Sequence, residues 1–230
     1  SPSYLAYIAK RAGVRRFIYG SSCSVYGYTV DKLFDETRPT ISNYPYGISK
    51  LQGEFGAMKQ QDDKFSVISL RQGTVCGYSP RMRLDLVVNT MFKFGMADRV
   101  ITVNHPAIWR PILDIRDAVS AYVRSIEAHQ DISGIFNVTS GNYTLAEIGD
   151  SVQEGLKKFL DVPTKVVIKH IQDFRNYKVS IKKANEVISF KPRYSIIDTV
   201  QCLADNLNEF KDFDNQQYYN IRTFKAMNHE

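Results

Sequence analysis

The hydrophobic and polar positions of the chain switch between helical spacing and short apolar runs. Apolar side chains recur at helical spacing in residues 4–11, and a short apolar run follows at 16–20. Helical spacing returns at 46–59, before a second apolar run at 65–71. Helices that alternate with buried strands are typical of a parallel sheet with helices on both faces. We therefore predict a doubly wound α/β fold.

The pattern changes after Gly77, where a turn-rich basic stretch precedes further elements. Thr144 and Glu147 have the spacing of a capping box, which predicts a helix that begins there. Ser195 is the predicted N-cap of the last helix. The other predicted elements are helices at 84–94, 117–128, 181–189 and 196–210, and strands at 100–103, 112–115, 135–138 and 166–170.

Length and composition predict a globular protein without a membrane span. The chain has 230 residues, 43% of them hydrophobic, enough for the core of one large domain or of one domain with an added lobe. No run approaches the roughly 18 apolar residues of a membrane helix, and no signal segment opens the chain, so a cytoplasmic location is expected. Cys23, Cys76 and Cys202 are odd in number and widely spaced, which favours reduced thiols.

The charge pattern favours a small anionic ligand over a nucleic acid. Thirty Lys and Arg residues against 24 Asp and Glu give a net charge of +6, which suits anionic partners. The basic residues are interspersed with acidic ones and form no recognisable nucleic-acid module, so we expect no nucleic-acid partner. The four histidines are dispersed without metal-ligand spacing, so we expect no metal site.

Tyr46 and Lys50 are the first candidate catalytic pair. They stand four residues apart in a predicted helix, which places them on one helix face, one turn from each other. A free tyrosine has a pKa near 10 and is a poor base at neutral pH, but a cation held nearby favours the phenolate. Alone, this spacing is a weak motif, because many such pairs are surface residues.

The segments around this pair carry a family resemblance. They are Ser21–Gly27 after a strand, Pro45 directly before Tyr46, Ser49–Leu51, Leu70–Gly77, Trp109–Ile112 with Asp117, Arg175–Tyr177, and Phe190–Pro192. With these segments in this order, the chain resembles the extended short-chain dehydrogenases/reductases of the NAD-dependent nucleotide-sugar epimerase/dehydratase family, which includes UDP-glucose 4-epimerase. The resemblance covers the chain from Ser3 to about Leu207.

This resemblance implies a partial Rossmann fold with a smaller C-terminal α/β lobe. The glycine-rich phosphate loop of the family has no counterpart here, so the N-terminal strands of the sheet are expected to be absent. Residues 1–77 would form the C-terminal half of the NAD-binding domain. Residues 78–210 would form mostly the substrate-binding lobe, with 105–140 returning to the Rossmann sheet, and 211–230 would be a polar tail.

The resemblance also implies roles for individual residues. Tyr46 is similar to the family's general acid/base, Lys50 to its partner on the nicotinamide ribose, and Ser22 to the hydroxyl that binds the reacting sugar oxygen. Tyr46, Lys50 and Ser21 would bind the cofactor, which is expected to be NAD, with NADP as the alternative. The implied partner is a nucleotide-diphosphate sugar, and the implied substrate-binding residues are Ser24, Thr74, Asn89, Arg110 and Arg175.

Several activities remain open within and beyond this family. A 4,6-dehydratase would be expected to carry an acid/base pair at Cys23 and Ser24, and neither is a carboxylic acid. An epimerase therefore fits best, followed by a reductase of a keto sugar. A catalytically silent binding or dimerisation module is the third reading. Apolar residues beyond one sheet-facing stripe predict a homodimer through the helices at 3–11 and 46–59.

Overall fold

The chain divides into two compact units. The computed structural model describes residues 1–27, 32–170 and 176–220. The first unit combines Ser1–Gly73, Trp109–Asn142 and Phe174–Arg193, and the second combines Thr74–Ile108, Tyr143–Asp173 and Tyr194–Glu230. Each unit is therefore built from segments that lie far apart in the sequence.

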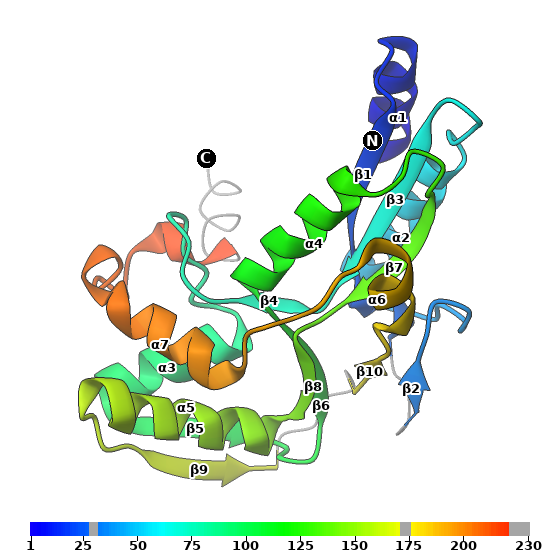
Figure 1. The fold of residues 1–230 in the computed structure, drawn as a ribbon. Coiled ribbons are helices and arrows are strands. Elements are labelled where there is room, and N and C mark those ends of the chain that lie inside the picture. Colours follow the sequence, from blue (N-terminus) through cyan, green and yellow to red (C-terminus); the bar gives the residue numbers. More distant parts are fainter. Residues whose placement is uncertain (28–31, 171–175, 221–230) are drawn as a thin grey trace, which may run out of the picture. The chain divides into compact units, whose positions relative to one another are not determined.

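A three-stranded parallel sheet forms the centre of the first unit (Figure 1). β1 (Arg16–Ser22) pairs with β3 (Ser66–Gln72), and β3 pairs with β7 (Gly134–Val138). β3 is buried from its first residue to Arg71, as expected for a strand covered on both faces. The helices of this unit are α1 (Pro2–Arg11), α2 (Pro45–Met58), α4 (Ile115–Glu127) and α6 (Lys182–Ile188).

Helices pack on both faces of this sheet. Successive side chains of a strand point to opposite faces. Phe17 and Tyr19 of β1 pack in an apolar cluster with α1 and α2. A Cβ atom on Gly20, the next residue, would lie 2.7 Å from the hydroxyl of Tyr122 in α4. The doubly wound α/β fold expected from the sequence is thus confirmed.

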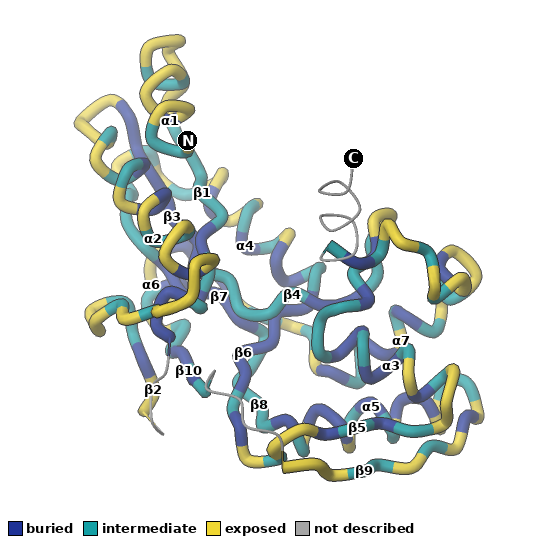
Figure 2. Tube along the Cα trace, turned by 180° about the vertical axis from the view of Figure 1, so that it is seen from behind, coloured by how far each residue is buried: buried dark blue, intermediate teal, exposed yellow. Residues whose placement is uncertain are grey.

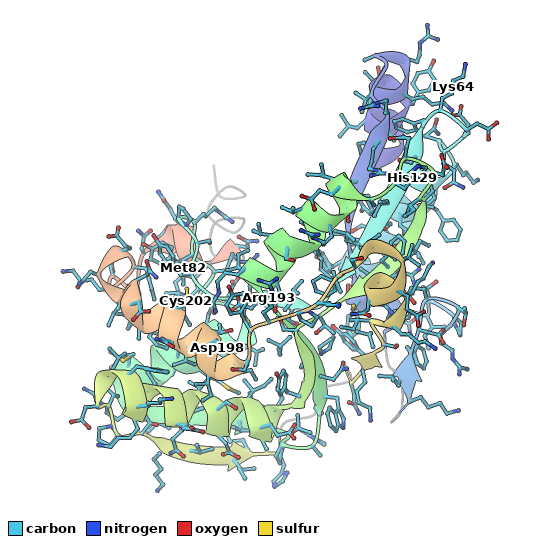
Figure 3. All side chains as sticks on the ribbon, in the orientation of Figure 1. Lys64, Met82, His129, Arg193, Asp198 and Cys202 are labelled. Carbon is cyan, nitrogen blue, oxygen red and sulfur yellow. The ribbon has the colours of Figure 1, made fainter. Side chains whose placement is uncertain are left out.

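The guanidinium of Arg16 ties β1 to the C-terminal end of α4. It donates hydrogen bonds to the carbonyl oxygens of Ser125 (2.8 Å), Ala128 (2.7 Å) and His129, the last of which is labelled in Figure 3. The last carbonyls of a helix lack partners within it, and a cation there also suits the helix dipole. This contact fixes α4 against the sheet.

Short strands complete the first unit beside a single 3₁₀ turn. β2 (Leu33–Phe34) pairs in parallel with β10 (Lys178–Val179). Both pack on η1 (Cys23–Tyr26) in one apolar cluster. β6 (Trp109–Asp114) leads directly into α4, which Asp114 caps by accepting a hydrogen bond from the Arg116 amide at 2.8 Å. The strand predicted at 112–115 therefore ends one residue earlier, because Asp114 starts the helix.

The second unit is a smaller α/β arrangement. Its elements are β4 (Thr74–Cys76), α3 (Val87–Asp98), β5 (Val100–Asn104), α5 (Leu145–Leu160), β9 (Lys165–Lys169), α7 (Ile196–Asp205), η2 (Leu207–Glu209) and η3 (Gln216–Tyr218), while β8 (Gly141–Thr144) spans the boundary. β5 and β9 pair in parallel. The capping box predicted for Thr144 and Glu147 is present at the start of α5. No helix in the described residues has the length and apolar character needed to cross a membrane.

The last helix is shorter than predicted. The pattern suggested a helix over 196–210, but α7 ends at Asp205. The side chain of Asn206 donates to the carbonyl oxygen of Cys202 at 2.8 Å and so takes up one of the last helical acceptors. Phe210 still becomes buried, because its ring packs in an aromatic cluster with Tyr78, Phe92 and Phe213.

Candidate active site

The carboxyl end of β1 turns sharply at a run of serines. Ser21 and Ser22 are the last residues of the strand, and Ser22 caps η1 because its Oγ accepts a hydrogen bond from the Ser24 amide at 3.2 Å. Gly27 ends the turn with a φ of 70°, a conformation that favours glycine. Strand, cap and turn together hold Ser22 and Ser24 at the edge of a parallel sheet, where open α/β folds bind ligands.

Two buried hydroxyl groups at this edge have no partner in the described part of the chain. Among the described residues, the Oγ atoms of Ser21 and Ser24 have no hydrogen-bond partner. Leaving a buried hydroxyl unsatisfied is unfavourable, so such groups require a separate explanation. A ligand with polar atoms at this edge would satisfy both.

Helix α2 presents Tyr46 and Lys50 beside the same strand. Pro45 occupies the first helical turn, where the missing amide proton costs nothing. Tyr46 is 58% exposed, and the Lys50 ammonium lies 5.8 Å from the centre of its ring. Lys50 Nζ also donates to the carbonyl oxygen of Gly20 in β1 at 2.8 Å. The four-residue spacing thus brings a cation and a phenol together next to Ser21.

Tyr19 supports the lysine from the strand. Its hydroxyl donates to the Lys50 carbonyl oxygen at 3.2 Å, and its ring centre lies 5.6 Å from the Lys50 ammonium. Burial lowers the pKa of Lys50 and raises that of Tyr19, where the nearby charge of Glu54 acts in the same direction. Both pKa shifts arise because the packing of α2 on β1 partly excludes water from these two side chains.

The predicted substrate-binding residues fall in both units. Arg110 lies in β6 of the first unit and is buried, and its Nη1 donates to the Trp109 carbonyl oxygen at 3.0 Å. Thr74 begins β4 of the second unit. Arg175 lies outside the described residues.

Asn89 of α3 in the second unit is 1% exposed. Its side chain exchanges hydrogen bonds with the Gly77 backbone at 3.0 and 3.2 Å and donates to the Arg83 carbonyl oxygen at 3.0 Å. Its polar groups therefore stabilise the turn after β4, and a substrate contact by this residue stays a prediction.

The sequence pattern did not single out the buried polar residues beneath the site. Glu54 on α2 pairs with Arg71 on β3, and Arg71 also contacts Tyr26 in η1. The available signal was chemical: Arg71 lies near the end of an apolar strand, and a buried charge needs a partner. Which residue supplies that partner depends on the packing of α2.

A comparison with protein families bears on this site. Residues 2–139 match the sequence model of the NAD dependent epimerase/dehydratase family, a span that contains Ser22, Tyr46, Lys50 and Arg110. The chain belongs to this family. The resemblance inferred from its motifs is therefore confirmed.

Curated members of the epimerase/dehydratase family match part of the chain. UDP-glucuronic acid decarboxylase 6 of Arabidopsis thaliana is 30% identical over 133 residues, which cover 56% of this chain and 38% of that protein. The dTDP-D-glucose 4,6-dehydratase of Homo sapiens is 31% identical over 121 residues, which cover 52% of this chain and 34% of that protein. The matched segments span little more than a third of these relatives.

Solved structures of similar fold support the Rossmann assignment. UDP-glucuronic acid 4-epimerase from Bacillus cereus, in complex with UDP-glucuronic acid and NAD, matches with a TM-score of 0.75 at 23% identity, over 90% of this chain and 66% of that one. MoeE5, in complex with UDP-glucuronic acid and NAD, matches with a TM-score of 0.74 at 21% identity, over 89% and 68%. At these identities the match establishes the fold.

Proposed function

We propose that this chain carries the catalytic residues of an NAD-dependent nucleotide-sugar epimerase, with Tyr46 as the acid/base. One observation carries the proposal. The Lys50 ammonium lies beside the Tyr46 ring and is anchored to Gly20, at the strand end where the buried hydroxyls of Ser21 and Ser24 find no partner in residues 1–27, 32–170 and 176–220. The chain's membership of the epimerase/dehydratase family supports it.

The residues of the chain account for the proton side of such a reaction. NAD, when bound, supplies a reversible acceptor for the hydride of the sugar carbon. Tyr46 removes the proton of the sugar hydroxyl at that carbon. It returns the proton to the same oxygen after the oxidised sugar has turned its opposite face toward the cofactor. The Lys50 ammonium stabilises the phenolate form in which Tyr46 accepts this proton, and Ser22 donates to the same sugar oxygen. Inversion at one carbon follows without net oxidation.

The strand edge fits a dinucleotide cofactor. Ser21 is 3% exposed and its Oγ lacks a partner among the described residues, so a polar ligand group would satisfy it. Lys50 offers further donors, because one of its three N–H groups is taken by Gly20. We assign Ser21, Tyr46 and Lys50 to cofactor binding. NADP is the alternative, as the similar RMD structure from Pseudomonas aeruginosa is a complex with NADPH.

Cys23 argues against a dehydratase. That reaction needs a base to remove a proton beside the transient ketone and an acid to expel hydroxide. Cys23 is fully buried, its thiol donates to the Arg71 carbonyl oxygen at 3.1 Å, and burial raises its pKa. A thiol held in this way cannot exchange protons with a sugar, which favours epimerisation.

We propose that residues of the second unit bind the nucleotide sugar and that two arginines bind its diphosphate. Arg110 and Arg175 are assigned to the phosphates, because a guanidinium matches their geometry. Ser24, Thr74 and Asn89 are assigned to the sugar.

In the full-length protein, Arg110→Ala should weaken nucleotide-sugar binding measured by titration calorimetry. Unchanged affinity would remove Arg110 from the site.

We extend the proposal to a homodimer through α1 and α2. Tyr4 and Leu5 of α1 and Phe55 of α2 are at least 60% exposed, and Figure 2 shows exposed positions along α1. An apolar face of this kind needs cover, and a two-fold axis lets one patch cover itself. Light scattering of the full-length protein at tens of micromolar tests this, since a monomer contradicts it.

The function is tested with a panel of nucleotide sugars. The full-length protein is incubated with each sugar and NAD, and products are identified by NMR and mass spectrometry. An epimer of unchanged mass is the expected product. Loss of water or of carbon dioxide would overturn the proposal in favour of a dehydratase or a decarboxylase. NADH-dependent gain of two hydrogens would make the protein a reductase.

A further inference from the structure

A buried ion pair lies under the candidate active site. Arg71 Nη2 of β3 and Glu54 Oε1 of α2 are 2.6 Å apart, with 4% and 2% of their side chains exposed. Arg71 Nε donates to both oxygens of the carboxylate, and Ser69 Oγ donates to Glu54 Oε2 at 3.0 Å. Burying two charges costs solvation, so an ion pair of this kind contributes little net stability. Its geometry suggests a different role.

The same guanidinium also reaches the turn at the end of β1. Arg71 Nη1 donates to the Tyr26 hydroxyl at 2.8 Å, and the guanidinium carbon lies 4.9 Å from the centre of the Tyr26 ring. The Tyr26 hydroxyl in turn donates to Asn137 Oδ1 of β7 at 2.8 Å. Tyr26 is the last residue of η1, whose first turn is capped by Ser22. Arg71 thus contacts the element that carries the serines.

One further contact and one residue spacing connect the same parts. The thiol of Cys23, the first residue of η1, donates to the Arg71 carbonyl oxygen at 3.1 Å. On the helix side, Tyr46, Lys50 and Glu54 follow one another at four-residue spacing, so all three lie along one stripe of α2. The ion pair with Arg71 holds Glu54 in place. It therefore also fixes the rotation of α2, the helix that presents Tyr46.

We propose that Arg71 is a positioning residue that holds the two halves of the active site in register, Tyr46 and Lys50 on α2 and Ser22 and Ser24 at η1. The inference rests on the proposed function. Arg71 stands on β3, which is paired on both sides by β1 and β7. From this middle strand its planar fork directs donors to Glu54 and to Tyr26 at once, a geometry that lysine cannot reproduce.

The consequence for catalysis is a requirement on distance. The phenol of Tyr46 and the hydroxyl of Ser22 are assigned to one sugar oxygen, so they must keep a fixed separation. A shift of about 1 Å in such an arrangement lowers a rate on the order of 100-fold. Arg71 would prevent that shift without touching the substrate.

Tyr26→Phe and Arg71→Lys test the proposal in the full-length protein. Tyr26→Phe keeps the ring and removes the hydroxyl, and with it both the Arg71 link to η1 and the hydrogen bond to Asn137. Arg71→Lys keeps the charge and removes the fork. Tyr219→Phe is the matched control, because it removes a buried phenol in the second unit, whose hydroxyl donates to the Phe213 carbonyl oxygen. Hydrogen exchange of residues 22–27 and 46–54 is measured together with kcat, KM and the thermal midpoint.

Each variant has its own expected result. Tyr26→Phe should speed exchange in 22–27 alone, and Arg71→Lys should speed it in both segments. Both should lower kcat about 10- to 100-fold with KM within about twofold, as expected for loss of alignment. Tyr219→Phe should leave hydrogen exchange in both segments, kcat and KM unchanged. A purely structural role would instead lower the thermal midpoint and leave kcat per folded molecule unchanged.

The test separates failure of this inference from failure of the proposed function. If Tyr46→Phe abolishes turnover while Tyr26→Phe leaves both kcat and exchange at wild-type values, the positioning role is overturned and the function stands. If the wild type turns over no nucleotide sugar, the function fails, and exchange alone decides whether Arg71 couples the two segments. Unchanged exchange in Arg71→Lys overturns the inference in either case.

Discussion

Helix α2 has two regions with opposite surroundings. Its first turns are open to solvent, and Tyr46 is 58% exposed there. Two turns later Glu54 is 1% exposed and is bonded to Arg71 and Ser69. The exposed end leaves a reactive group accessible to substrate, and the buried end fixes the helix on the sheet. One helix can serve both needs because its two ends meet different neighbours.

The largest effect is expected at the exposed end. In the full-length protein, Tyr46→Phe should lower turnover on the order of 100- to 10,000-fold, because the hydroxyl transfers the proton. Nucleotide-sugar affinity should stay within a few-fold, because the ring remains. Steady-state kinetics and titration calorimetry measure the two quantities. Retention of more than a tenth of the rate would remove Tyr46 from the acid/base role.

At the buried end the expected effect is on stability. Glu54→Leu should lower the free energy of unfolding by about 3–5 kcal/mol, because Arg71 is left charged and buried without its carboxylate. Urea denaturation measures this. The double variant with Arg71→Met should recover most of the loss, since no charge remains unpaired. Equal stability of the single variant and the wild type would show that the pair is solvated.

Gly53 tests how closely the buried end approaches the sheet. A Cβ atom there would lie 2.3 Å from the Tyr19 hydroxyl and 3.0 Å from Pro2 Cγ. Gly53→Ala should therefore destabilise the protein by about 1–3 kcal/mol through overpacking. In an unconstrained helix the same change would stabilise by up to about 1 kcal/mol. The sign of the change in denaturation midpoint decides between the two.

Gln52 provides the control on the same helix. It is exposed, although it stands between Lys50 and Glu54 in the sequence. Gln52→Ala should change the free energy of unfolding by less than about 0.5 kcal/mol. A larger loss, measured by the same denaturation experiment, would show that this face of α2 is covered in solution. That result would also bear on the proposed dimer.

Local patterns predicted the elements better than their ends. The capping box of Thr144 and Glu147 was predictable because both partners lie within one turn. The end of α7 was not, because the burial of Phe210 comes from aromatic rings of other segments and not from a longer helix. An apolar residue that continues the helical spacing can be buried by a longer helix or by side chains of other segments.

The candidate site divides in the same way. The proximity of Tyr46 and Lys50 follows from their spacing alone, since residues four apart lie on one helix face. The anchoring of Lys50 to Gly20 does not, because it joins residues from two elements. The hydrogen bonds of Asn89 to the backbone of its own unit were likewise not predictable from the sequence, and its contact with a substrate stays a prediction.

The sequence by itself determined the α/β class, the family and the pairing of Tyr46 with Lys50, because these depend on spacings within single elements and on motif order. Only the tertiary structure decided that the hydroxyls of Ser21 and Ser24 lack a partner within the described residues and that Glu54, Arg71 and Tyr26 meet. Burial depends on what every other segment contributes around a residue. A buried charge selects its partner from side chains that packing brings near, and the linear pattern does not contain that information.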